Sequence, residues 1–409
     1  MKKLALSLCA LAAAGTASAQ SSLILFGVVD TAVSYYSVKS RSWGATLPRE
    51  VTQSQTALSP SGYTSSRIGF RGTEDLGGGL AAGFWLEAPV ANDSGALGVA
   101  NFGRRSTVSL SGPFGEVRLG RDYTASFWND AVFDPFGVNG VGTNLIAVVN
   151  SNLAASRALA TGGLLNGGLS AGTDSYLRTS NAISYFLPSK LAGVYGQVQY
   201  ALHENAKVST SLTGTSERGR YVGGRLGWTD GKADVALGYG ESTLVSTQPG
   251  GEKIKSLNIG GSYDFGMVKV LGEWSRVRDV RDGTAALPVG LTDRYDGLVA
   301  GVNVPVGPGI IRASIARVNF DNGNDLPGSD ASVDKLALGY VHNLSKRTAL
   351  YASVARIRVR NGHNNPVVMG VTPLVLSLPA ILPQPAYVST GGMEPRSSYG
   401  YDFGIRHAF

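Results

Sequence analysis

Apolar and polar residues alternate along most of the chain from about residue 22 onward. Between residues 66 and 87, for example, Ile68 and Phe70 alternate with Arg67 and Arg71. A period of two places successive side chains on opposite faces of an extended strand. No long window shows the period of an amphipathic helix. The pattern predicts an all-β protein of sixteen strands, near residues 23–35, 63–75, 80–90, 102–112, 115–123, 176–187, 191–203, 218–230, 232–245, 254–265, 267–279, 294–304, 308–320, 333–344, 347–360 and 397–409.

The connections between these strands alternate in length. Short connections fall at 75–79, 111–115, 187–190, 229–232, 264–266, 305–309 and 343–346. Long ones fall at 36–62, 91–101, 124–175, 204–217, 246–253, 280–293, 321–332 and 361–396. Short turns at one end and long loops at the other are typical of an antiparallel up-and-down barrel that spans an outer membrane. No change in composition marks a domain boundary, so we expect one domain.

A soluble β-protein and a membrane barrel differ in which face of the strands, the inner or the outer, is apolar. Sixteen apolar strand faces, with 55 glycines in the chain, would pack poorly around one interior core. In a lipid bilayer only a closed barrel satisfies every backbone group of a strand. The apolar face then meets lipid and the polar face lines a water-filled bore, which side chains cannot fill at this strand number. We therefore expect Arg67, Arg71, Glu87 and Arg118 to line a pore.

The first residues have the pattern of an export signal. Lys2 and Lys3 precede an apolar run, and Ala17, Ser18 and Ala19 form a small-residue cleavage site. We expect residues 1–19 to be a signal peptide and residues 20–409 to be the barrel. The single cysteine lies within the signal, so no disulfide is expected in the mature chain.

Charge and motifs exclude several other functions. The net charge of +7 is spread along the chain, which disfavours nucleic acid as a partner. The four histidines lie far apart without metal-ligand spacing, so no metal is expected. The glycine–serine stretches have neither a nucleophile elbow nor the helix that a phosphate loop needs. We expect no catalysis and no cofactor.

The C-terminus has the same two-residue period. In "YGYDFGIRHAF", Tyr401, Phe403 and Phe409 share one face, and Phe409 is the last residue. A strand that ends on an aromatic residue without a tail suits closure of a barrel against the first strand. We expect these three residues to form a terminal closing signature.

Several stretches together resemble the general porins of the Gram-negative outer membrane, in particular the trimeric type of β-proteobacteria. They are "SSLILFGVVDTAV", "SRIGFRGTEDLGGGLAAGFWLE", "FGRRSTVSLSGPFGEVRLGRDYT", "LRTSNAISYFLPSKLAGVYGQVQYAL", "DKLALGYVHNLSKRTALYASVARIRVRNG" and "YDFGIRHAF". The resemblance implies a homotrimer in the outer membrane, in contact with its lipids. It also implies that the third long loop folds into the lumen and narrows the pore.

The resemblance also implies where the constriction lies. The segment "NDAVFDPFG" takes the place of the acidic constriction segment, which makes Asp130 and Asp134 the acidic side, together with Glu87 on the wall. Arginines of the facing wall map to Arg67, Arg178 and either Arg104 or Arg105. These two neighbours cannot both point inward from a regular strand, and a bulge would reconcile them. Enteric relatives carry a lysine on the first strand where this chain has Val28.

These features predict a passive pore for ions and small hydrophilic solutes, with a weak leaning to anions. Fixed charges along a narrow, low-dielectric bore bias which ion enters. Two alternatives fit the same pattern: a channel specific for one small organic or inorganic anion, and a non-conducting barrel adhesin. The Pro-rich stretch 362–393 has no assigned role.

Overall fold

The computed structural model describes residues 22–44, 49–95, 101–160, 176–189, 191–204, 217–245, 251–283, 289–323, 327–370, 385, 387–389 and 391–409. The expected signal peptide lies outside these residues. The strands of the described chain are β1 (Ser22–Ser42), β2 (Glu50–Pro60), β3 (Arg67–Gly77), β4 (Leu80–Pro89), β5 (Arg105–Gly112), β6 (Gly115–Tyr123), β7 (Arg178–Phe186), β8 (Val194–Ala201), β9 (Tyr221–Thr229), β10 (Ala233–Val245), β11 (Glu252–Asp264), β12 (Lys269–Arg281), β13 (Leu291–Val306), β14 (Gly309–Asp321), β15 (Ala331–Asn343), β16 (Thr348–Arg360) and β17 (Met393–Ala408).

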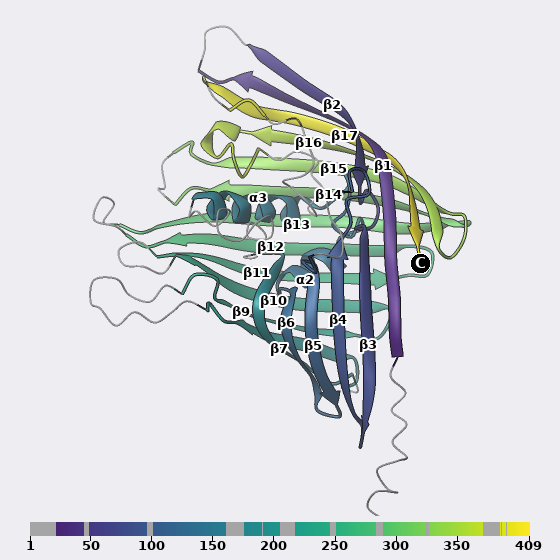
Figure 1. The fold of residues 1–409 in the computed structure, drawn as a ribbon. Helices are drawn as coiled ribbons and strands as arrows, with labels where there is room; N and C mark the ends of the chain where they lie inside the picture. The colour runs from purple at the N-terminus through teal and green to yellow at the C-terminus, as the bar shows by residue number, and fades with distance from the viewer. Residues whose placement is uncertain are drawn as a thin grey trace, which may run out of the picture.

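The strands form one closed antiparallel sheet (Figure 1). Each strand from β3 to β17 pairs with the next, and β17 pairs with β1. The residues 22–28 of β1 pair with β3 and residues 31–41 pair with β2. The strands β2 and β3 thus share one position in the wall, and the 17 described strands make a barrel of sixteen positions. The predicted sixteen-stranded barrel is confirmed.

The predicted loop at 36–62 is wrong. The strand β1 continues to Ser42 and returns as β2, which ends at Pro60. Most of β2 is exposed or half-exposed on both faces, because only β1 pairs with its length. Neither face of β2 therefore needs to be apolar, and the alternation that identified the other strands is weak here.

The two faces of the wall carry the predicted chemistry along most strands. On β11, Leu257 and Ile259 are 37% and 46% exposed on the outside, whereas Asn258 between them is 1% exposed inside the barrel. In a soluble β-protein the apolar residues would be the buried set. The inverted pattern is the one that a barrel in lipid requires.

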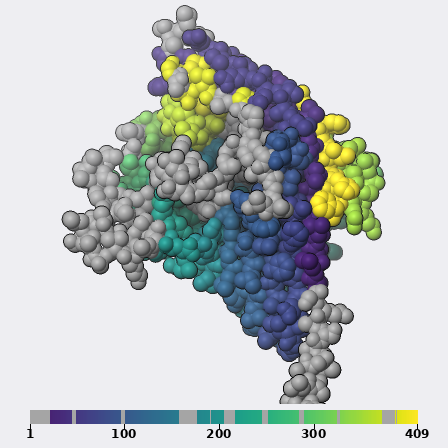
Figure 2. All heavy atoms as spheres, in the orientation of Figure 1, coloured from purple at the N-terminus to yellow at the C-terminus, as the bar shows by residue number. Residues whose placement is uncertain are grey.

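The barrel closes at the chain ends. The backbone N–H of Gly27 donates to the carbonyl of Phe409 at 3.0 Å, and the N–H of Phe409 donates back at 3.1 Å. The space-filling view shows the N-terminal strands in purple beside the C-terminal strand in yellow (Figure 2). Tyr401 and Phe403 face outward on β17, and the Tyr401 ring stacks on Tyr35 with the centroids 5.3 Å apart.

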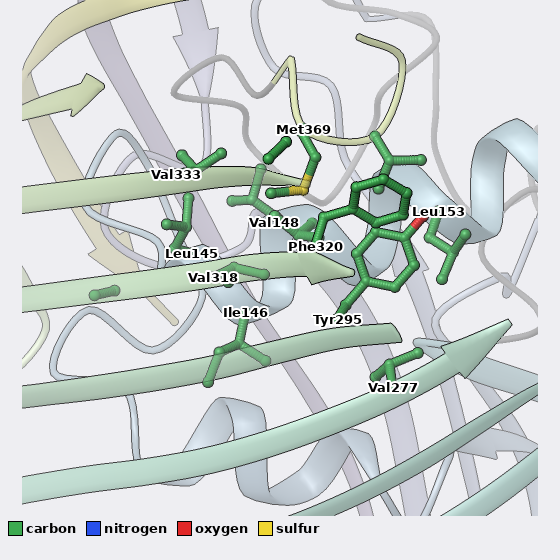
Figure 3. Packing of buried hydrophobic residues seen from close by; sticks show 14 of the residues in the cluster. Leu145, Ile146, Val148, Leu153, Val277, Tyr295, Val318, Phe320, Val333 and Met369 are labelled. Atoms are coloured by element: carbon green, nitrogen blue, oxygen red, sulfur yellow. The ribbon is translucent and has the colours of Figure 1, made fainter. Parts of the chain in front are cut away.

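The third long connection folds inside the barrel and contains two helices. The helices are α2 (Phe127–Val132) and α3 (Leu145–Ala160). The apolar side chains of α3 pack against the inner wall of β12 to β15 (Figure 3). The sequence showed no helical period in this segment. Residues 145–149 of α3 are all buried, so α3 lacks the single apolar stripe of a surface helix.

The inner wall that receives α3 departs from the predicted polar lining. Val277, Tyr295, Val318, Phe320 and Val333 point inward from β12 to β15 and are buried under α3. An apolar patch inside the barrel holds the loop by removing apolar surface from water. On these strands, near the long-loop end, the alternation is inverted and charged residues face outward.

The start of the Pro-rich stretch also lies within the barrel mouth. After β16 the chain forms a short helical turn, η2 (Gly362–Asn364). Val368 and Met369 are buried in the cluster that holds α3, and Asn365 donates from Nδ2 to Tyr295 Oη at 2.8 Å. The part of this stretch that the structure describes therefore helps to hold the third loop. No helix in the described residues is both long and apolar enough to cross a membrane.

Candidate pore constriction

Three charged residues from neighbouring strands meet on the inner wall. Arg104 Nε lies 2.6 Å from Oε1 of Glu87, and Arg67 Nε lies 3.7 Å from the same oxygen. Arg67 comes from β3 and Glu87 from β4, while Arg104 precedes β5 by one residue. The side chain of Arg67 is 28% exposed and that of Arg104 is 7% exposed. Arg67 is therefore the arginine of this pair that faces the open lumen.

Tyr123 joins a third arginine to this group. Its hydroxyl accepts hydrogen bonds from Nη2 of Arg104 at 3.1 Å and from Nη2 of Arg178 at 3.0 Å. The Arg178 guanidinium also lies over the Tyr123 ring, 4.5 Å from its centroid. The sequence predicted the three arginines but not Tyr123, which ends β6 at the start of the third loop. In the sequence, the position of Tyr123 in "GRDYT" marks only where the third loop begins and does not indicate a contact with the arginines.

A local irregularity turns both Arg104 and Arg105 inward. Glu87 is the register partner of Arg105, yet its carbonyl also accepts from the backbone N–H of Arg104 at 3.1 Å. Two residues thus oppose one, as in a β-bulge. The Arg105 guanidinium lies over the Trp85 ring at 4.3 Å, and its Nε lies 3.5 Å from Asp122. The two arginines that the sequence left as alternatives both contact inner-wall residues.

Arg71 and Arg118 also line the inner wall, closer to the short-turn end. Arg118 lies 2.6 Å from Asp122 and 2.9 Å from Glu116. Arg71 lies over the Trp85 ring at 5.0 Å, and no salt bridge joins it to the described residues. A hollow of about 400 Å³ lies beside these side chains.

The structure does not bring the two loop aspartates to the arginines. Asn258 donates to Asp130 Oδ1 at 2.8 Å, and Tyr176 donates to the other oxygen. The oxygens of Asp134 accept three backbone N–H groups, from Phe136, Val138 and Asn144, at 2.9–3.0 Å. Both aspartates are buried, and both bind the loop to itself or to β11. Burial raises the pKa of each carboxyl above its ordinary value.

Further contacts attach the third loop to distant strands. The Val141 N–H donates to Asp402 Oδ2 of β17 at 2.7 Å, and the ammonium of Lys335 on β15 donates to the carbonyl of Thr143. Asn129 Nδ2 donates to Asn258 at 3.0 Å. The loop is thus tied to β11, β15 and β17 as well as to its own strands. The sequence does not indicate that Asp402 and Lys335 bind the third loop, because each lies far along the chain from it.

The electrostatic balance of the cluster is positive. Arg67, Arg104 and Arg178 share one wall. Glu87 pairs with Arg67 and Arg104, and Arg178 contacts Tyr123. Guanidinium groups stay protonated beside one another because the free pKa of arginine exceeds 12. In a bore with low-dielectric walls this excess charge acts at longer range than in bulk water.

A closed β-barrel with an apolar outside, a charged inner wall and a loop folded into its bore defines a membrane channel of the porin class. The sequence matches the Gram-negative porin family over residues 5–362, and the chain belongs to this family. It is 34% identical to outer membrane porin protein 32 of Delftia acidovorans over the full length of both chains. It is 29% identical to an outer membrane porin protein of Bordetella pertussis, over 86% of this chain and 93% of that one.

A solved structure gives the same assignment. The anion-selective porin from Comamonas acidovorans superimposes with a TM-score of 0.68 and 31% identity, over 95% of this chain and 100% of that one. The chain is a porin of the outer membrane, as the sequence predicted.

Proposed function

We propose that the pore favours anions and that Arg67, Arg104 and Arg178 set this preference. The supporting observation is the charge ratio at the cluster, where three guanidinium groups meet one carboxylate. An anion in the narrow bore exchanges part of its hydration for guanidinium N–H donors, whereas a cation meets repulsion. The solved relative with 31% identity is described as anion-selective, which is the selectivity we infer here.

Each arginine has its own part in this proposal. Arg67, the more exposed side chain, contacts the passing ion. Arg104 and Arg178 both donate hydrogen bonds to Tyr123, and they act as fixed charges behind Arg67. Fixed donors need no reorganisation as the ion passes, so their field is constant. Arg105, with Arg71 and Arg118, extends the charged wall towards the short-turn end.

Asp130 and Asp134, the acidic residues of the predicted constriction, act on the pore through the loop that carries them. Their carboxylates bind loop and wall groups rather than the arginines, so they act by fixing where the loop lies. Solutes pass by diffusion between the loop and the arginine wall. The pore carries out no chemistry and needs no cofactor.

A double substitution tests the arginine assignment. Reversal potentials in a salt gradient across planar bilayers should show anion preference for the wild type, and Arg67→Ala with Arg178→Ala should reduce or remove it. The matched control is Arg278→Ala with Arg294→Ala, which removes two arginines from the outer face of β12 and β13. Unchanged selectivity in the first variant, or equal loss in the control, would show that the assignment is wrong.

Two further measurements separate the alternative functions. Liposome swelling with solutes of increasing size should give a smooth decrease in rate, because diffusion through a wide pore does not saturate. Saturable uptake and block by a single anion would instead identify a specific channel. A barrel that conducts no ions in any orientation would identify a non-conducting adhesin.

The assembly is proposed to be a homotrimer with one pore in each subunit. This follows the porin family resemblance. Native mass spectrometry in detergent should give three chains in each particle, and a single-chain particle with full conductance would contradict the proposal.

A further inference from the structure

The outer face of β14 to β16 carries arginines where the rest of the wall carries apolar residues. Arg317 on β14 and Arg356, Arg358 and Arg360 on β16 are all exposed. Their neighbours in sequence point inward, and Ile357 and Val359 are 0% exposed beneath α3 and the following chain. The inner wall takes the apolar residues at this level, so the arginines face away from the pore.

The register of the strands places these arginines in one compact group. Arg317 and Arg358 are both Cα partners of Asp334 on β15. Arg356 lies one step nearer the membrane centre, opposite Leu336, which in turn lies opposite Ile315. Two adjacent rows therefore run around the barrel. One contains Leu298, Arg317, Asp334 and Arg358, and the other contains Ala300, Ile315, Leu336 and Arg356.

A groove lies between these two rows. It has a volume of about 490 Å³, and both rows contribute apolar side chains and arginines to its lining. The apolar lining residues Leu298, Ile315 and Leu336 are 58–61% exposed. We call this site the arginine groove, defined by Leu298, Ile315, Leu336, Arg317, Arg356 and Arg358.

The positive charge of the arginine groove is only partly balanced. Asp334 pairs with Arg317 at 2.6 Å and with Arg360 at 3.0 Å. Among the residues that the structure describes, Arg356 and Arg358 form no salt bridge. Two guanidinium groups beside an apolar hollow thus have free donors that point towards the surroundings of the barrel.

The position of the groove indicates what surrounds it. The strand β16 ends at Arg360 and leads into the long connection after it, and β14 ends beside the long connection that precedes β15. Long loops are extracellular in barrels of this class, so the groove lies at the level of the outer leaflet. The outer leaflet of the Gram-negative outer membrane contains a phosphorylated, multiply acylated glycolipid.

We propose that the arginine groove binds a phosphorylated glycolipid of the outer leaflet. An acyl chain lies along Leu298, Ile315 and Leu336, and a sugar phosphate accepts hydrogen bonds from Arg356 and Arg358. Arginine suits this role because its planar N–H fork matches the oxygens of a phosphate. The occupant supplies both the negative charge and the hydrocarbon that the groove lacks.

The inverted alternation also explains why the site occurs here. The apolar inner patch of β12 to β16 is needed to hold α3, so the outward positions of the same strands need not all face hydrocarbon. This inference depends on the outer-membrane location of the porin and not on the selectivity of its pore. A failure of either proposal is therefore distinguishable from a failure of the other.

Native mass spectrometry of the detergent-purified porin tests this inference. The probe is a bisphosphorylated, acylated disaccharide lipid, and its dephosphorylated form is the second arm. We expect the wild type to bind the bisphosphorylated form, and Arg356→Gln with Arg358→Gln to bind it about tenfold or more weakly, since charge-assisted hydrogen bonds are lost. Arg356→Lys with Arg358→Lys should retain part of the affinity and become more sensitive to salt.

The matched control is Lys253→Gln with Lys255→Gln. These lysines lie on the outer face of β11 at the same end of the barrel, are 37% and 38% exposed, and pair with Glu241. The control removes two positive charges, as the test variant does, but at a place outside the arginine groove. It should bind the lipid like the wild type. Conductance in planar bilayers should be unchanged in every variant, which confirms that each barrel is folded.

Four outcomes would overturn the proposal. The wild type would bind neither lipid, or the glutamine variant and the wild type would bind the bisphosphorylated lipid equally. Equal binding of the dephosphorylated lipid would show that the phosphate is not recognised. Loss of the oligomer in the glutamine variant, with lipid binding retained, would show that the arginine groove is instead a contact between copies of the chain.

Discussion

The Nε of Arg104 donates a hydrogen bond of 2.6 Å to Oε1 of Glu87, although Arg104 lies outside the regular part of β5. The irregularity before β5 lets Arg104 join the inner wall together with Arg105. Because Glu87 holds Arg104 this closely, Arg67 at 3.7 Å is the more loosely held partner. A single carboxylate therefore organises two of the three arginines in the proposed constriction.

The substitution Glu87→Gln should increase anion preference. It removes the carboxylate that offsets the arginines and keeps a side chain of similar size. Two unit charges about 4 Å apart in water interact with an energy of about 1 kcal/mol. Removal of such an interaction between Glu87 and a passing ion corresponds to a roughly fivefold change in the permeability ratio of anion to cation. Reversal potentials measure the ratio.

The control for this variant is Glu241→Gln, on the outer face of β10, where Glu241 pairs with Lys253 and Lys255. It should leave the reversal potential unchanged. A shift of Glu87→Gln towards cations would contradict the proposed role of the cluster.

The substitution Gly140→Ala should displace the tip of the third loop. Gly140 has φ +62°, and an added Cβ would lie 2.1 Å from the carbonyl oxygen of Gly62. The left-handed conformation alone costs about 1–2 kcal/mol for a residue with a side chain. We expect altered single-channel conductance and more current noise, because the nearby contact of Val141 with Asp402 is disturbed.

Gly231→Ala is the matched control, since Gly231 has φ +92° but an added Cβ would meet no atom within 4 Å. Gly231→Ala has the same kind of backbone strain as Gly140→Ala, but its added Cβ does not collide with a neighbouring atom. If both variants conduct like the wild type, the tip of the loop does not depend on this close approach.

The substitution Leu145→Ala should loosen α3 from the inner wall. Leu145 is 0% exposed in the apolar cluster of Figure 3. Loss of a buried leucine costs about 2–5 kcal/mol. We expect lower stability in urea titrations and a larger, more variable conductance, because the loop blocks less of the bore.

Val132→Ala gives the comparison, because Val132 on α2 is 37% exposed. This variant should be close to the wild type in both measurements. A Leu145→Ala protein with normal conductance and normal stability would show that the apolar patch does not hold the loop.

The substitution Phe409→Ala should weaken closure of the barrel. The Phe409 ring lies against Gly27, where an added Cβ would be 2.3 Å from the ring. Truncation of a phenylalanine that is only partly buried costs less than the ~3–5 kcal/mol of a fully buried one. The barrel should unfold at a lower temperature in detergent, as followed by circular dichroism.

Phe403→Ala is the reference for this test, since Phe403 is 63% exposed on the outer face. It should lower the unfolding temperature less than Phe409→Ala does. The reverse order would show that the terminal ring is not important for closure.

The sequence was sufficient to predict the barrel because the information is local. Lipid on one face of the wall and the barrel interior on the other give most strands a two-residue period, which β12 to β15 keep even where the alternation is inverted near the long loops. The strand β2 was missed because it is exposed on both faces and needs no such period. Arg67 and Arg178 could be placed on the inner face for the same local reason.

The tertiary structure decided how the third loop lies and what each of its residues contacts. The family resemblance made Asp130 and Asp134 the acidic side of the constriction, yet they bind Asn258 and the backbone of the loop. Likewise, Val141 is attached to Asp402, 261 positions away. Strand alternation depends on the solvent that each residue meets, so the chain encodes it position by position. Contacts between distant segments depend on how the closed barrel brings them together, so only the folded molecule determines them.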